Sequence, residues 1–122
     1  MSSDNLSYGQ TITQTKANSL FDADIAVVET AVNTLPKLSK LTQDQFDAIS
    51  SLVFNVGTAP VKDTSNDLYK ALNKDTFVKS EIVTGFTYTL VNGVRNQGLV
   101  NRRNVELNLF FGTSDVEYIS MT

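Results

Sequence analysis

The sequence contains neither cysteine nor histidine. Without cysteine the fold has no disulfide bonds, and the composition suits a reducing compartment. Without histidine the chain lacks the side chain that most often acts as an acid or base near neutral pH, and it lacks the commonest metal ligand in proteins. We therefore expect no metal site and no cofactor.

Long apolar segments are also absent. The chain has no run of about 18 apolar residues, so no segment is expected to span a membrane. Its first residues, Met1–Asp4, provide neither the basic nor the apolar region of a secretory signal peptide. The sequence thus predicts a cytoplasmic protein without a membrane partner.

Positive charge is scarce, with 10 Lys and Arg against 13 Asp and Glu, a net charge of −3 and a pI of about 4.7. A net negative chain is not attracted to polyanions, which argues against nucleic acid as a ligand. The same charge removes the electrostatic attraction that would help an enzyme to reach an anionic cell wall.

The residues that are present fit one globular domain. The chain has 122 residues, of which 41% are hydrophobic and 19% charged, as is typical of folded proteins. A chain of this length buries about two thirds of its unfolded surface. We assign residues 1–122 to a single domain, with a polar start at 1–12 and a tail at 113–122.

Residues 41–57 form the most informative stretch. Thr42 and Gln45 have the spacing of a capping box, in which each side chain bonds the other's backbone N–H. Apolar residues then recur at helical spacing, and Gly57 is expected to end the helix in a left-handed conformation. The pattern predicts a central helix, and its best-buried cluster is expected to be Phe46, Ile49, Leu52 and Val53.

Four further helices are indicated by apolar spacing, at residues 14–35, 65–73, 76–91 and 99–111. Pro36 should end the first, because the residue before a proline avoids the helical region. Residues 58–61 are predicted to form a loop, Asp63 or Thr64 to cap the second helix, and Gly112 to stop the last.

The stretch 76–91 is ambiguous. Its apolar residues fit a helix, but Thr84, Gly85, Thr87 and Thr89 favour extended structure. Asn92-Gly93, directly after it, predicts a turn.

Three motifs occur in a fixed order along the chain. They are LTQDQFDAISSLVFNVGT at 41–58, SNDLYKALN at 65–73, and Asn92-Gly93 followed by GLVNRRNVEL at 98–107. In this order and spacing they resemble the phage-type lysozymes, the endolysin muramidases, over roughly residues 5–112. The resemblance implies a mainly α fold: a lysozyme-like large helical lobe of about five helices with little or no β-structure. It also favours a helix at 76–91 and makes residues 14–35 the helix that links the small lobe to the large one.

The resemblance further implies hydrolysis of the peptidoglycan glycan by a Glu, an Asp and a Thr near the start of the chain. The strand that carries the Thr corresponds to residues 5–11, where Tyr8, Gly9 and Thr11 match. Asn5 stands at the position of the catalytic Thr, and Gln10 replaces a His. Met1–Asp4 leave no counterpart for the Glu or the Asp. We therefore expect no catalytic residue and no hydrolysis, with residues 1–12 as a remnant of the small lobe.

Other carboxylates are expected to be surface or structural groups, namely Asp22, Asp24 and Glu106. The simplest interpretation of Arg102 and Arg103 is a pair on a helix surface that contacts Glu106 one turn later. Together with Arg95 they form the only dense basic cluster, so all three are also candidates for binding a partner.

The resemblance places the family's sugar groove at Phe54, Ser65 and Asn92. Each also has a purely structural interpretation, Phe54 as a core aromatic and Asn92 as a turn residue. Retention of glycan binding at these positions is one alternative.

Three functions remain open. The first is a catalytically inactive phage or prophage protein that binds a partner, either as an inhibitor of a host factor such as a defence protein or as a virion structural component. The second is a working muramidase, or a fragment of one whose catalytic residues come from another chain. The third is binding of residual glycan.

The first function comes with an expected interface. Loss of the small lobe would expose part of the linking helix, so Tyr8 and Phe21 are expected to contact a host protein or a second copy of the chain. The competing expectation is that Val116, Tyr118 and Ile119 of the tail cover that surface.

Overall fold

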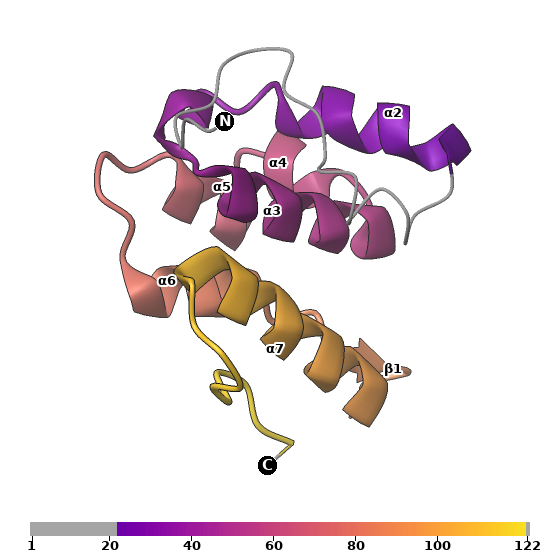
Figure 1. Ribbon diagram of the computed structural model, residues 1–122. Coiled ribbons are helices and arrows are strands. Elements are labelled where there is room, and N and C mark those ends of the chain that lie inside the picture. The colour runs from indigo at the N-terminus through magenta and orange to yellow at the C-terminus, as the bar shows by residue number, and fades with distance from the viewer. Residues whose placement is uncertain (1–21, 122) are drawn as a thin grey trace.

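The computed structural model describes residues 22–121, with side chains described from Ala26 onward (Figure 1). The predictions for Asn5, Tyr8 and Phe21 therefore lie outside the described residues. The described part is mainly helical, as predicted, and its β-structure is limited to two short strands. In chain order the elements are α2 Asp22–Val32, η1 Leu38–Lys40, α3 Gln43–Val56, α4 Ala59–Lys62, α5 Asp67–Leu72, α6 Lys79–Gly85, β1 Leu90–Val91, β2 Val94–Arg95 and α7 Gln97–Phe111.

Helix α3 is central, and it packs against α2 on one side and α7 on the other (Figure 1). Its capping box forms as predicted: Gln45 N donates to Thr42 Oγ1 at 3.1 Å, and Thr42 N donates to Gln45 Oε1 at 2.9 Å. Gly57 ends the helix with a φ of 98° and a ψ of −175°. The positive φ was expected, but the extended ψ lies outside the left-handed helical region, in a region that essentially only glycine adopts.

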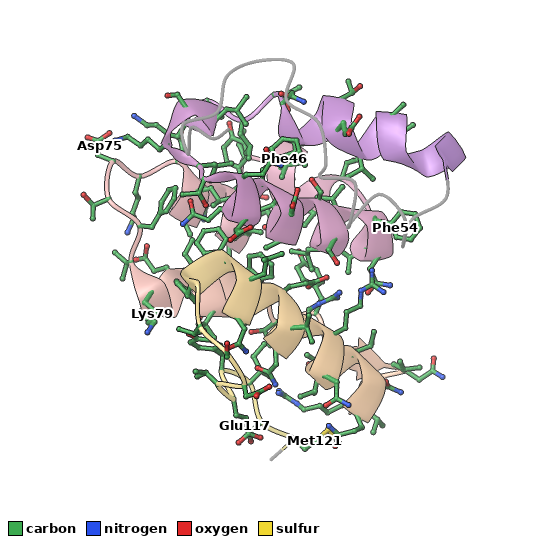
Figure 2. The ribbon with its side chains drawn as sticks, viewed as in Figure 1. Phe46, Phe54, Asp75, Lys79, Glu117 and Met121 are labelled. Atoms are coloured by element: carbon green, nitrogen blue, oxygen red, sulfur yellow. The ribbon has the colours of Figure 1, made fainter. Side chains whose placement is uncertain are left out.

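The predicted cluster on α3 is confirmed as core. Phe46, Ile49 and Leu52 are fully buried, and Val53 is 2% exposed. Figure 2 shows Phe46 inside the molecule, whereas Phe54 lies at the outer end of α3. Buried residues of the other helices complete this core, among them Val28, Val32, Val61, Leu68, Leu72, Ile82, Val100, Leu107 and Phe110. Each large apolar side chain that is fully buried contributes about 1.5–3 kcal/mol.

The linking helix ends earlier than predicted. Its part before Asp22 lies outside the described residues, and α2 ends at Val32 rather than at residue 35. The chain tightens there, because Thr34 N donates to Ala31 O and Leu35 N to Val32 O, each at 3.1 Å. These are bonds between residues three apart, and they end the helix before Pro36 restricts the residue ahead of it.

Residues 58–66 differ from the prediction in two ways. The expected loop contains the one-turn helix α4, whose first turn accommodates Pro60 because N–H groups there need no helical partner. The cap of α5 is Asn66, whose Oδ1 accepts from Leu68 N at 2.8 Å. Asp63 instead accepts bonds from the backbone N and hydroxyl of Ser65, which makes a local turn rather than a helix start.

The prediction of one helix over 76–91 is wrong. Helix α6 covers only Lys79–Gly85, and the chain then becomes extended and forms β1. Gly85 is required by packing, because a Cβ there would lie 2.7 Å from the Cα of Leu68 on α5. The helical pattern therefore holds over α6, which includes Thr84 and Gly85, whereas Thr87 and Thr89 lie in the segment after it.

Strands β1 and β2 form an antiparallel hairpin in which Leu90 pairs with Arg95 and Val91 with Val94. The predicted turn at Asn92-Gly93 joins them, with φ of 52° and 79° at these two residues. Positive φ at both positions is what a two-residue hairpin turn of the favoured type demands. Asn96 Oδ1 then accepts from Leu99 N at 3.0 Å, so α7 starts two residues before the predicted boundary.

The tail packs on α7 and not on α2. Ile119 is 6% exposed and belongs to the core cluster, and the Tyr118 ring lies 5.2 Å from that of Phe111. Figure 1 shows the tail on the side of α7 away from α2. The surface around Tyr8 and Phe21 that the tail was expected to cover lies outside the described residues, so that expectation stays a prediction.

Replacing Leu52 by alanine should lower the free energy of unfolding by about 2–5 kcal/mol, because the substitution leaves a cavity in the core. Chemical denaturation measures this loss. Val27→Ala on α2 is the matched control, since Val27 is 60% exposed and should change stability little. A loss below about 1 kcal/mol for Leu52→Ala would show that α3 is not the centre of the core.

Candidate functional site

A buried ion pair joins the two turns at the middle of α7. Arg103 and Glu106 are 0% and 1% exposed, and they form a bidentate pair. Arg103 Nε lies 2.6 Å from Glu106 Oε1, and Nη2 donates to Oε2 at 2.9 Å. The predicted contact is confirmed, but the prediction that Arg103 lies on the helix surface is wrong.

Two further side chains contact Glu106, in addition to Arg103. The Ser51 hydroxyl on α3 donates to Glu106 Oε2 at 2.6 Å, and Arg102 Nε lies 3.4 Å from the same oxygen. Burial is the largest influence on the pKa of Glu106 and raises it, whereas Arg103, Ser51 and Arg102 act to lower it. A carboxyl that is 1% exposed and held by these partners supports the fold.

Arg103 also connects the pair to two residues at the surface. Its Nη1 donates to Asn55 Oδ1 on α3 at 2.9 Å and lies 3.4 Å from the backbone oxygen of Tyr88. Asn66 Nδ2 donates to the Tyr88 hydroxyl at 2.8 Å from the start of α5. The buried Arg103 therefore holds Asn55 and Tyr88 in place.

These two residues line a groove of about 400 Å³ between the end of α3, the segment after α6 and the first turn of α7. The lining residues are Asn55, Val56, Thr87, Tyr88, Thr89, Leu90 and Leu99. The lining is mainly apolar with a few hydroxyl and amide groups, as is usual for small-molecule sites. The hydroxyl of Thr89 is buried and has no hydrogen-bond partner among the described residues.

The candidates Phe54, Ser65 and Asn92 do not line this groove, although each is close in sequence to a residue that lines or supports it. Phe54 is half-buried and directly precedes Asn55, and Asn92 lies two residues beyond Leu90 at the hairpin turn. Ser65 is exposed and directly precedes Asn66, the residue that bonds Tyr88. Their role in glycan binding stays a prediction.

The three arginines do not form one cluster. Arg102 and Arg103 contact Glu106, whereas Arg95 lies on β2 and donates from Nη1 to the backbone oxygen of Ser120 at 2.9 Å. Of the three, Arg102 alone is both next to the ion pair and appreciably exposed, at 38% of its side chain.

Sequence reasoning missed the lining residues themselves. Asn55 and Leu99 stand within the quoted motifs, so the motifs carried a signal for them. Tyr88 and Thr89 had no such signal, because their position depends on where α6 ends and β1 begins.

The lining of the groove contains no carboxylate. In the part of the chain that the structure describes, no cluster of His, Cys, Asp or Glu is suited to hold a metal ion. No described helix is both long and apolar enough to cross a membrane. The side chains of Asp22 and Asp24 lie outside the described residues.

Replacing Arg103 by methionine should lower the free energy of unfolding by about 3–5 kcal/mol, since Glu106 would remain buried without its main partner. Urea denaturation measures the change. The double variant Arg103→Met with Glu106→Leu should recover much of the loss, because it leaves no unpaired buried charge. A single variant as stable as the parent would contradict this account.

Comparison with known proteins identifies the family of this chain. Residues 2–106 match the family model described as phage lysozyme. The chain is 40% identical over 110 residues to the endolysin of Acyrthosiphon pisum secondary endosymbiont phage 1, which covers 87% of this chain and 73% of that protein. It is 43% identical over 49 residues to the endolysin of Salmonella phage P22, covering 40% and 33% of the two chains. It is 35% identical over 101 residues to the endolysin of Bacillus phage B103, covering 83% and 37%. Among solved structures, none matches significantly. The family model and the first of these relatives each span most of the chain, which therefore belongs to the phage lysozyme family.

Proposed function

We propose that this chain acts in the hydrolysis of peptidoglycan as an endolysin-type muramidase. The observation that carries the proposal is the 40% identity over 110 residues to a protein named endolysin, because this match spans 73% of the relative. It favours the enzymatic alternative over the inactive inhibitor that the substitution at Asn5 suggested.

The groove has the composition that a saccharide chain requires. Tyr88 and Leu99 offer apolar surface for the faces of sugar rings, and the exposed Asn55 and Thr87 offer polar groups for their hydroxyl and acetamido substituents. Because Arg103 fixes Asn55 and Tyr88 from beneath, the groove is formed before the ligand arrives, which lowers the entropic cost of binding.

The described residues supply binding rather than acid catalysis. A glycosidase needs a carboxylic acid that protonates the leaving oxygen, and no carboxylate lines the groove. The carboxylates before Ala26 are Asp4, Asp22 and Asp24. We propose that the acid is one of these or comes from another chain. Arg102, Arg103 and Glu106 carry a combined charge of +1. A carboxylate that approaches these three residues is therefore attracted.

Clearing of permeabilised bacterial cells tests the proposal, and a measurable rate for the full chain is the expected result. A rate no higher than that of buffer, for a chain shown by circular dichroism to be folded, would overturn it. In that case the interpretation as an inactive binding protein of a phage or prophage, with a host factor or a second copy as partner, would be favoured.

The groove itself is tested by Leu90→Asp, with Val94→Asp as the matched control. Leu90 is 58% exposed and lines the groove, whereas Val94 is 69% exposed on the neighbouring strand and does not. Losing the apolar contact of one side chain should reduce clearing about tenfold in Leu90→Asp. Val94→Asp should keep the parental rate. Equal rates for the two variants would show that the glycan binds elsewhere.

A further inference from the structure

The chain reverses direction after α7 and returns along it. Gly112 makes the reversal, with a φ of 69° and a ψ of 33°, the left-handed conformation that glycine adopts at low cost. Residues 113–121 then run back beside the helix, as Figure 1 shows. Because this segment lies beyond the part matched by the family model, its role has to be read from its own contacts.

Two asparagines of α7 hold the backbone of this segment. Asn108 Oδ1 accepts from Val116 N at 3.0 Å, and its Nδ2 donates to Val116 O at 2.8 Å. Asn104 Oδ1 accepts from the backbone N of Tyr118 and Ile119 at 2.9 Å each, and its Nδ2 donates to Ile119 O at 2.8 Å. The two asparagines are four residues apart, so they share one face of α7. They fix the path of the tail through its backbone.

The third attachment lies on the hairpin instead of on α7. Arg95 Nη1 donates to Ser120 O at 2.9 Å, directly after the residues that Asn104 holds. The successive anchors Asn108, Asn104 and Arg95 thus lead the tail back to β2. Met121, next in the chain, lies at the far end of this path (Figure 2).

The hairpin that receives the tail also forms one wall of the groove. Arg95 pairs with Leu90, and Asn96 N donates to Thr89 O at 2.8 Å, so both lining residues face the strand that Arg95 occupies. Each strand has only two residues, and a two-stranded hairpin is marginally stable alone. An attachment outside the hairpin therefore adds to the bonds that keep Thr89 and Leu90 in place.

We propose that Arg95 is a positioning residue. Through Ser120 it fastens the β1–β2 hairpin to the anchored tail, and this attachment holds Thr89 and Leu90 in the wall of the groove. The tail thereby sets the affinity of the groove for a saccharide. The position of the hairpin is argued from its own contacts, whereas the identity of the ligand rests on the proposed function.

Amide hydrogen exchange of the full chain tests the position of the hairpin. In Arg95→Ala the Asn96 N–H, which bonds Thr89 O, should exchange about tenfold faster, because a charged donor that holds the hairpin is lost. Amides in the middle of α3 and the midpoint of urea denaturation should change little. Arg95→Lys should restore part of the protection, because its ammonium group can still donate to Ser120 O.

Lys79→Ala is the matched control for contact with the tail. Lys79 lies 5.5 Å from the Tyr118 ring and so touches the tail without touching the hairpin. Its loss should leave exchange at Asn96 unchanged. Unchanged exchange in Arg95→Ala, or an equal increase in Lys79→Ala, would overturn the proposal.

The affinity for the β-1,4-linked trimer of N-acetylglucosamine gives the second measurement. The parent should bind it, and Arg95→Ala should bind several-fold more weakly, with Lys79→Ala at the parental value. Equal affinity of parent and Arg95→Ala would overturn the effect on the groove. If the parent does not bind the trimer, the proposed ligand is wrong, and faster exchange at Asn96 still supports the positioning role of Arg95.

Discussion

The buried pair of Arg103 and Glu106 is the interaction on which the rest of the structure depends. Two charges removed from water cost several kcal/mol unless each finds partners, and here each has more than one. Glu106 accepts from Ser51, while Arg103 reaches Asn55 and the backbone of Tyr88. The pair therefore fixes the seam between α3 and α7 and, at the same time, the floor of the groove. Apolar residues of the same volume would fill the space, but they would not orient Asn55.

The central helix was predictable because its signals are local. The capping box depends on residues three apart, and the buried face depends on a repeat of three and four. Both are present in the order of the residues alone, so Phe46 and Leu52 were identified correctly as core. The burial of Arg103 was not predictable in this way, because charged side chains are almost never fully buried without a partner. Its partner Glu106 was visible in the sequence, but the α3 residues that seal the pair come from another part of the chain.

The segment between α5 and α7 shows why the groove could not be derived from the sequence. Its apolar spacing indicates a helix, and its threonines and Gly85 indicate extended structure. Gly85 is nevertheless the last residue of α6, and glycine is required there because Leu68 of α5 leaves no room for a side chain. Where α6 ends determines where Tyr88 and Thr89 lie. Local propensity does not locate that boundary, so the wall of the groove could not be derived from the sequence.

For the tail, the sequence predicted that it packs but not the surface on which it packs. Its apolar residues predicted packing, and Ile119 does pack, but the surface it covers is that of α7. The asparagines that select this surface are polar residues in mid-helix, which the apolar pattern ignores. Asn104 and Asn108 bond the backbone of the tail, so these bonds do not depend on which side chains the tail carries. Its direction is fixed instead by the helix beneath it. A segment held in this way runs toward the start of α7, and there it meets the hairpin through Arg95.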